Sequence, residues 1–90
     1  MAEHRPITVL IVSASSIFRA GLRHVLENDP DISVGGYVYD ASSAVEQVRK
    51  HTPNVIVMDM DLPRIDVAEI IEQVAGYSPD TRYIAVLGAS

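Results

Sequence analysis

Four apolar segments alternate with segments of helical periodicity along the chain. Residues 7–12 and 54–58 are nearly continuous runs of β-branched and other aliphatic side chains, which is typical of strands buried on both faces of a parallel sheet. Residues 32–39 alternate only loosely and contain Gly35-Gly36, so they predict a weaker, peripheral strand. Residues 82–87 form the fourth predicted strand.

A first helix is predicted after Ser15 or Ser16, either of which is a suitable N-cap, and it should end near residues 28–30. Its apolar positions recur at helical spacing and its charged positions lie between them. The positions expected to face the sheet are Ile17, Ala20, Gly21, Val25 and Leu26, and those expected to face solvent are Arg19, Arg23 and Glu27.

Two more helices are predicted. One begins at a cap formed by Asp40 or Ser42 and runs to about residue 51. The other covers about residues 66–75, with Gly76 as its expected C-terminal stop.

Strands that alternate with helices of this length imply right-handed βαβ crossovers and a parallel sheet. Ninety residues are enough for one small domain, and no repeat or long linker divides them. No helix is predicted after the fourth strand, so we expect the domain to be interrupted there.

The composition excludes several classes of function. Seven basic and twelve acidic residues give a net charge of -5, so the segment lacks the basic surface that binding to a phosphate backbone requires. The absence of cysteine excludes disulfides and thiolate metal sites. No apolar run approaches the roughly 20 residues that cross a bilayer, and the N-terminus lacks a secretory signal, so we expect a cytoplasmic protein without membrane contact.

Asp59 is the strongest candidate for chemistry, because it directly follows a buried strand, at the edge where open α/β sheets bind their ligands. Ser13 and Ala14 follow the first strand in the same way, and neither is a carboxylate. Asp61 and Asp66 are expected to be an exposed loop residue and a helix-start residue, since carboxylates favour helix N-termini.

The remaining polar residues carry weaker signals. Ser13, Ser15 and Ser16 lack the G-x-S-x-G context of a nucleophile. The histidines are not spaced as metal ligands and are expected at the surface or at helix ends; they are His4, His24 and His51. Tyr83 is expected to serve packing. No catalytic residue, metal site or cofactor is therefore predicted.

Several segments together resemble the receiver domains of response regulators, and most closely the subfamily that carries a LuxR-type DNA-binding domain. The segments that carry this resemblance are residues 7–12, 18–23, 29–32, 53–63 and 79–87. The resemblance implies a flavodoxin-like, doubly wound sheet of strand order 2-1-3-4-5 that stops here after the fourth strand. It also implies that residues 1–90 are an incomplete receiver domain and that a DNA-binding domain follows residue 90.

The same resemblance assigns roles to the candidate residues. Asp59 corresponds to the phosphoacceptor, and two acidic residues that hold Mg²⁺ in the family are Ser13 and Ala14 here. A hydroxyl-bearing residue is replaced by Gly88, and a small residue, generally glycine, by Val67. Because Mg²⁺ neutralises charge during phosphoryl transfer, these departures predict a degenerate pocket that does not use the family's usual mechanism.

We therefore expect a non-enzymatic, atypical receiver domain that controls a DNA-binding transcription factor as a homodimer. A small molecule bound around Ser13, Asp59 and Gly88, or a protein partner, would supply the signal. Two alternatives stay open: a phosphorylatable switch at Asp59 that binds Mg²⁺ weakly, and a pure dimerisation or protein-interaction module.

Overall fold

The computed structural model describes residues 5–59 and 61–87 and contains one four-stranded parallel sheet in this part of the chain. The strands are β1 (Ile7–Val12), β2 (Ile32–Val38), β3 (Val55–Asp59) and β4 (Arg82–Val86). Their order is β2-β1-β3-β4, so the predicted α/β class and the predicted order of the first four strands are confirmed.

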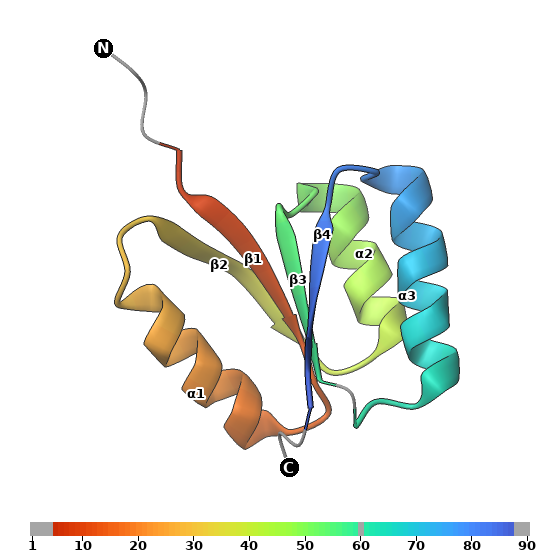
Figure 1. The fold of residues 1–90 in the computed structure, drawn as a ribbon, viewed down its shortest axis with the longest axis horizontal. Coiled ribbons are helices and arrows are strands. Elements are labelled where there is room, and N and C mark those ends of the chain that lie inside the picture. The colour runs from red at the N-terminus through yellow and green to blue at the C-terminus, as the bar shows by residue number, and fades with distance from the viewer. Residues whose placement is uncertain (1–4, 60, 88–90) are drawn as a thin grey trace.

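Three helices connect the described strands. They are α1 (Ser16–Glu27), α2 (Ala41–His51) and α3 (Arg64–Tyr77). Figure 1 shows α1 on one face of the sheet and α2 with α3 on the other, as right-handed crossovers between parallel strands require. No helix in residues 5–59 and 61–87 is both long and apolar enough to cross a membrane.

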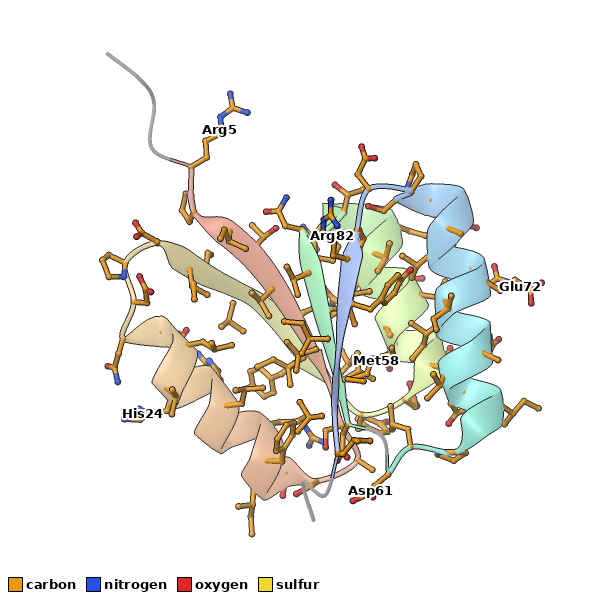
Figure 2. The ribbon with its side chains drawn as sticks, viewed as in Figure 1. Arg5, His24, Met58, Asp61, Glu72 and Arg82 are labelled. Carbon is orange, nitrogen blue, oxygen red and sulfur yellow. The ribbon has the colours of Figure 1, made fainter. Side chains whose placement is uncertain are left out.

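Strand β1 lies at the centre of the core and is buried on both faces. Its residues Leu10 and Val12 pack with Ile56 and with residues of α2 and α3, whereas Val9 and Ile11 pack with residues on the α1 side. Met58 in β3 belongs to the first of these clusters, and Figure 2 shows it toward α2 and α3. The continuous apolar run of β1 thus contributes side chains to two separate hydrophobic cores, one on each face of the sheet.

The face of α1 that contacts the sheet differs from the prediction. Ile17 and Val25 are 84% and 63% exposed, and Ala20 and Gly21 are exposed as well. Of the five positions predicted to face the sheet, only Leu26 packs on it. It does so together with two residues that the prediction omitted, Phe18 and Leu22.

The inner face of α1 follows the four-residue spacing of Phe18, Leu22 and Leu26, and two arginines lie beside it toward β2. The guanidinium of Arg19 lies 5.9 Å from the ring centre of Tyr39, and that of Arg23 lies 4.9 Å from the ring centre of Tyr37. Arginine stems cover apolar surface and their planar heads stack on aromatic rings. Arg19 and Arg23 are therefore half-buried against the β2 side instead of facing solvent; Glu27 is exposed as predicted.

The N-caps of the first two helices agree with the prediction. Ser15 Oγ accepts a hydrogen bond from the Phe18 N–H over 3.1 Å, and Asp40 Oδ1 accepts one from the Ser43 N–H over 2.8 Å. Each bond satisfies a backbone donor that the first turn leaves free.

Helix α3 is longer than predicted at both ends, and Gly76 does not stop it. The helix ends one residue later, where the N–H of Ser78 donates to the carbonyl of Val74. The hydroxyl of Thr81 donates to the carbonyl of Pro53 over 2.6 Å and lies 2.6 Å from the hydroxyl of Ser78. This buried polar contact, which hydropathy does not encode, fixes the helix end against the start of β3.

Candidate functional site

Parallel pairing brings the ends of β1 and β3 together at the carboxyl edge of the sheet. Val12 pairs with Met58, so the next residues along each strand, Ser13 and Asp59, become neighbours. Both are buried, with Ser13 0% and Asp59 2% exposed. The edge that sequence reasoning assigned to chemistry therefore holds a buried serine beside a buried carboxylate.

Both oxygens of the Asp59 carboxylate accept hydrogen bonds. The hydroxyl of Ser13 donates to Oδ2 over 2.8 Å, and the N–H of Asp61 donates to Oδ1 over 3.0 Å. Among the described residues, no buried side-chain nitrogen or oxygen lacks a partner. Within residues 5–59 and 61–87, the two donors recorded for the carboxylate, the Ser13 hydroxyl and the Asp61 N–H, are both neutral.

Ser13 is fixed at each of its polar groups. Its Oγ accepts from the N–H of Ser15 over 3.0 Å, which leaves the hydroxyl hydrogen to be donated to Asp59. Its N–H donates to the carbonyl of Val38 over 2.9 Å. Its carbonyl accepts from Nη1 of Arg19 over 2.6 Å.

Arg19 is the residue of this site that sequence reasoning missed. We expected it on the solvent side of α1, but it reaches back over the loop to the Ser13 carbonyl and stacks near Tyr39. The pattern of apolar positions could not reveal this, because it treats every charged residue as an exposed one. The structure thus places the guanidinium of Arg19 on the backbone of Ser13, the residue that donates to Asp59.

The other predicted site residues contribute less. Ala14 is exposed and offers only a methyl group. Asp61 is exposed at the carboxyl edge of the sheet, as Figure 2 shows, and Asp66 lies in the first turn of α3. Val67 packs against the core cluster beneath α2 and α3. Gly88 lies outside the described residues.

The histidines and Tyr83 within the described residues do not contribute to the site. His24 projects outward from α1 (Figure 2), His51 is exposed at the end of α2, and His4 lies outside the described residues. Tyr83 is half-buried and packs against the α2 and α3 core, where desolvation raises the pKa of its hydroxyl. Packing is therefore its role in the described structure, as predicted.

The Mg²⁺ ion that this fold family uses does not fit the residues present. Mg²⁺ requires oxygen ligands in octahedral geometry, commonly including one or two carboxylates. After β1 the chain offers Ser13, whose hydroxyl is already donated to Asp59, and Ala14, which has no donor atom. No group of three or more His, Cys, Asp or Glu residues within 5–59 and 61–87 could hold a metal ion.

Comparison with known proteins agrees with this fold. The family model of the response regulator receiver domain matches residues 9–90. The protein-glutamate methylesterase/protein-glutamine glutaminase 1 of Geobacter sulfurreducens is 39% identical over 84 residues, which are 93% of this chain and 23% of that protein. The chain thus spans under a quarter of the length of this relative.

Two solved structures are similar in the same way. The response regulator domain of Thermotoga maritima CheB is 32% identical with a TM-score of 0.80, over 92% of this chain and 61% of that one. A LuxR-family two-component response regulator from Aurantimonas is 26% identical with a TM-score of 0.80, over 91% of this chain and 59% of that one. With the family model covering nearly the whole sequence, the chain belongs to the receiver-domain family of response regulators.

Proposed function

We propose that this receiver domain regulates an output domain of the same protein without Mg²⁺-dependent phosphorylation of Asp59. The observation that carries the proposal is the hydrogen bond from Ser13 to Asp59, at the end of β1 where a metal-binding receiver needs carboxylates. Ser13 gives Asp59 a neutral donor in place of a cation. The residues of the degenerate pocket are then Ser13, Ala14 and Gly88, with Asp59 as an unused acceptor.

The surroundings of Asp59 support this proposal. Attack on a phosphoryl donor requires an accessible carboxylate oxygen and positive charge that neutralises the transferred group. Asp59 is almost fully buried, and each of its oxygens already accepts a hydrogen bond. Phosphorylation would have to break the Ser13 contact without a metal ion to compensate for its loss.

A regulatory signal would then come through contacts instead of a phosphoryl group. We propose a cytoplasmic homodimer whose assembly, or whose binding of a protein or small molecule, controls the output. The receiver domain itself is non-catalytic in this proposal. Its net charge of -5 is unfavourable for direct contact with DNA, so DNA binding falls to another domain.

For the output, we propose a DNA-binding domain that follows residue 90. The LuxR-family regulator from Aurantimonas supports this assignment, at 26% identity. A methylesterase output is the second candidate, because the Geobacter sulfurreducens methylesterase is 39% identical and the Thermotoga maritima CheB domain is 32% identical. Either output domain is compatible with this receiver domain. The choice between them decides whether the full-length protein binds DNA or acts as a methylesterase.

The test uses the full-length protein with Asp59→Asn, and with Asp61→Asn as a control at an exposed neighbour. We would incubate each protein with acetyl phosphate and Mg²⁺ and measure its mass. Promoter binding and release of methanol from methylated receptor peptides would be assayed in parallel. We expect no phosphorylated species, and an output activity in Asp59→Asn equal to that of the wild type.

Phosphorylation of the wild type that disappears in Asp59→Asn, together with a change in output, would establish the phosphorylatable switch instead. A wild-type protein that is active in one of the two output assays identifies the output directly. Oligomeric state measured on the same samples separates regulation through dimerisation from regulation through another partner.

A further inference from the structure

A recess lies at the opposite end of the sheet from Asp59, between the sheet and the last turns of α2. It has a volume of about 180 Å³ and is lined by residues from the first half of β1, from the middle of β2, and from α2 and the segment after it. The residues that matter most are Leu10, Gly35, Gln47, His51 and Pro53. Neither Ser13 nor Asp59 contributes to it, so the recess is separate from the site described above.

A β-bulge with two glycines creates the recess. Val9 pairs with Val34 and Leu10 pairs with Gly36, so Gly35 is an extra residue in β2. A Cβ on Gly36 would lie 3.4 Å from both Gln47 Oε1 and Leu10 Cδ1, so it would be in van der Waals contact with both side chains. The nearest atom to a Cβ on Gly35 would be the backbone carbonyl oxygen of Val9, at 3.9 Å, so the adjacent space is unfilled.

The lining is mostly apolar, with a few polar groups near its opening. Leu10 and Pro53 are buried and form the apolar part, whereas Gln47 is half-buried and His51 is exposed. Gln47 brings its Oε1, a hydrogen-bond acceptor, close to Gly36. Among residues 5–59 and 61–87, no Asp or Glu lines the recess.

The apolar lining disfavours an anion, because a charged group would lose hydration there. The last turn of α2 is mixed in charge, since its free carbonyl groups carry partial negative charge while Arg49, Lys50 and His51 are basic. A ligand that donates a hydrogen bond there, or to Gln47, is favoured over one that brings a carboxylate. The size also limits the ligand, because an apolar cavity of about 150 Å³ accepts a benzene ring.

We propose that this recess binds a neutral, ring-sized organic molecule that carries one O–H or N–H donor. The ring lies against Leu10 and Pro53, and its donor faces Gln47 Oε1. The proposal does not depend on how Asp59 is used, because phosphorylation at the other end of the sheet neither creates nor removes these contacts.

Phenol is a suitable probe, with benzoate as a ring of similar size that carries a negative charge. Each would be titrated into the ¹⁵N-labelled full-length protein while the amide shifts are followed by NMR. We expect saturable shifts for phenol centred on Gly35 and Gln47, with a Kd on the order of 1 mM for so small a ligand. Benzoate should bind at least about fivefold more weakly.

Two variants test the position of the ligand. Gly35→Val places a side chain in the open space and should abolish binding, whereas Ser33→Val adds the same side chain at an exposed position of β2 outside the recess and should not. Gln47→Met keeps the length of the side chain but removes the acceptor, so it should weaken binding about 2- to 10-fold.

No saturable shift at about 20 mM phenol would overturn the proposal. Unchanged binding to Gly35→Val would do the same, and equal or tighter binding of benzoate would refute the assigned ligand class. Amide spectra of each variant without ligand report whether it is folded. If Gly35→Val is not folded, Gln47→Met provides the test.

Discussion

The hydroxyl of Ser13 donates a 2.8 Å hydrogen bond to Oδ2 of Asp59, although the two residues are 46 positions apart in the sequence. The parallel pairing of β1 with β3 creates this contact, because Val12 pairs with Met58 and the residues that follow them, Ser13 and Asp59, become neighbours. The Ser15 N–H donates to the same hydroxyl oxygen, so the direction of the Ser13 bond is fixed. A buried carboxylate is thereby stabilised by a group that can neither bind Mg²⁺ strongly nor carry charge.

Ser13→Ala should destabilise the domain. The variant leaves Oδ2 of a carboxylate that is 2% exposed without its donor, which typically costs about 1–3 kcal/mol of unfolding free energy. Urea denaturation measures the loss, and Ser33→Ala, at an exposed position of β2, is the control that should change stability by less than about 0.5 kcal/mol. Equal effects of the two substitutions would show that the Ser13 bond contributes nothing specific.

Replacing Ser13 and Ala14 together by aspartate should create a metal response that we do not expect of the wild type. Three carboxylates would then meet at the ends of β1 and β3, where Ser13 and Asp59 are neighbours. Without metal, mutual repulsion of the carboxylates should lower the stability of Ser13→Asp/Ala14→Asp, and Mg²⁺ should restore part of it by binding the folded state.

The measurement is a titration with Mg²⁺ and then with beryllofluoride, a mimic of the aspartyl phosphate, followed by backbone amide shifts. We expect shifts centred on Asp59 in the double variant and none in the wild type. A double variant that carries Asp59→Asn as well is the matched control, since it keeps the two new aspartates. Saturable shifts around Asp59 in the wild type would contradict the proposed function.

The fold could be predicted from the sequence because each strand has a recognisable pattern of apolar residues. β1 and β3 are short apolar runs with charged or polar residues at their ends, and the loose pattern with two glycines placed β2 at the edge of the sheet. The same reasoning found Asp59 and its neighbours Ser13 and Ala14. It could not find their hydrogen bond, because that depends on which residues of two distant strands pair.

In helix α1 the prediction chose the wrong apolar positions, since Phe18, Leu22 and Leu26 also recur at helical spacing and are the ones that pack on the sheet. Arg19 and Arg23 each combine a long apolar stem with a head that can stack on a ring, so they compete with aliphatic residues for the inner side of the helix. The tyrosine rings near these arginines lie in and directly after β2, outside the helix itself. The contact of Arg19 with Ser13 is therefore a tertiary effect that the pattern within α1 could not reveal.

The N-cap of α2 should make stability depend on pH. The N–H of Ser43 donates to Asp40 Oδ1 over 2.8 Å, and this bond, with a further contribution from the Ser43 hydroxyl, holds the pKa of Asp40 below its usual 3.8. A lowered folded-state pKa means that the carboxylate stabilises the fold fully above pH 3.8 and loses this effect as pH falls through the folded value.

Asp40→Asn keeps a capping side chain that does not titrate, so it isolates this effect. The difference in unfolding free energy between wild type and Asp40→Asn should shrink as pH falls from about 5 to about 2. Urea denaturation across this range measures it, and NMR titration of the Asp40 carboxyl gives the midpoint. A midpoint at or above 3.8 would show that the cap does not favour the charged form.

Strand β4 should cause the 90-residue polypeptide to self-associate. Within residues 5–59 and 61–87, β4 pairs only with β3, so its other edge presents backbone groups to solvent. Ile84 lies on this strand opposite Val57, on the sheet face that α1 covers only in part, and it is 52% exposed. An apolar edge of this kind favours pairing with a second copy.

Sedimentation velocity over a range of concentrations tests this expectation. The wild-type polypeptide should shift toward dimer as concentration rises, and Ile84→Lys should remain monomeric, because a charged residue on an edge strand opposes pairing. Ile17→Lys is the matched control: Ile17 is more exposed, at 84%, but lies on α1 away from the edge, so its replacement should leave association unchanged. If Ile17→Lys were the variant that stays monomeric, the contact between copies would involve α1 and not β4.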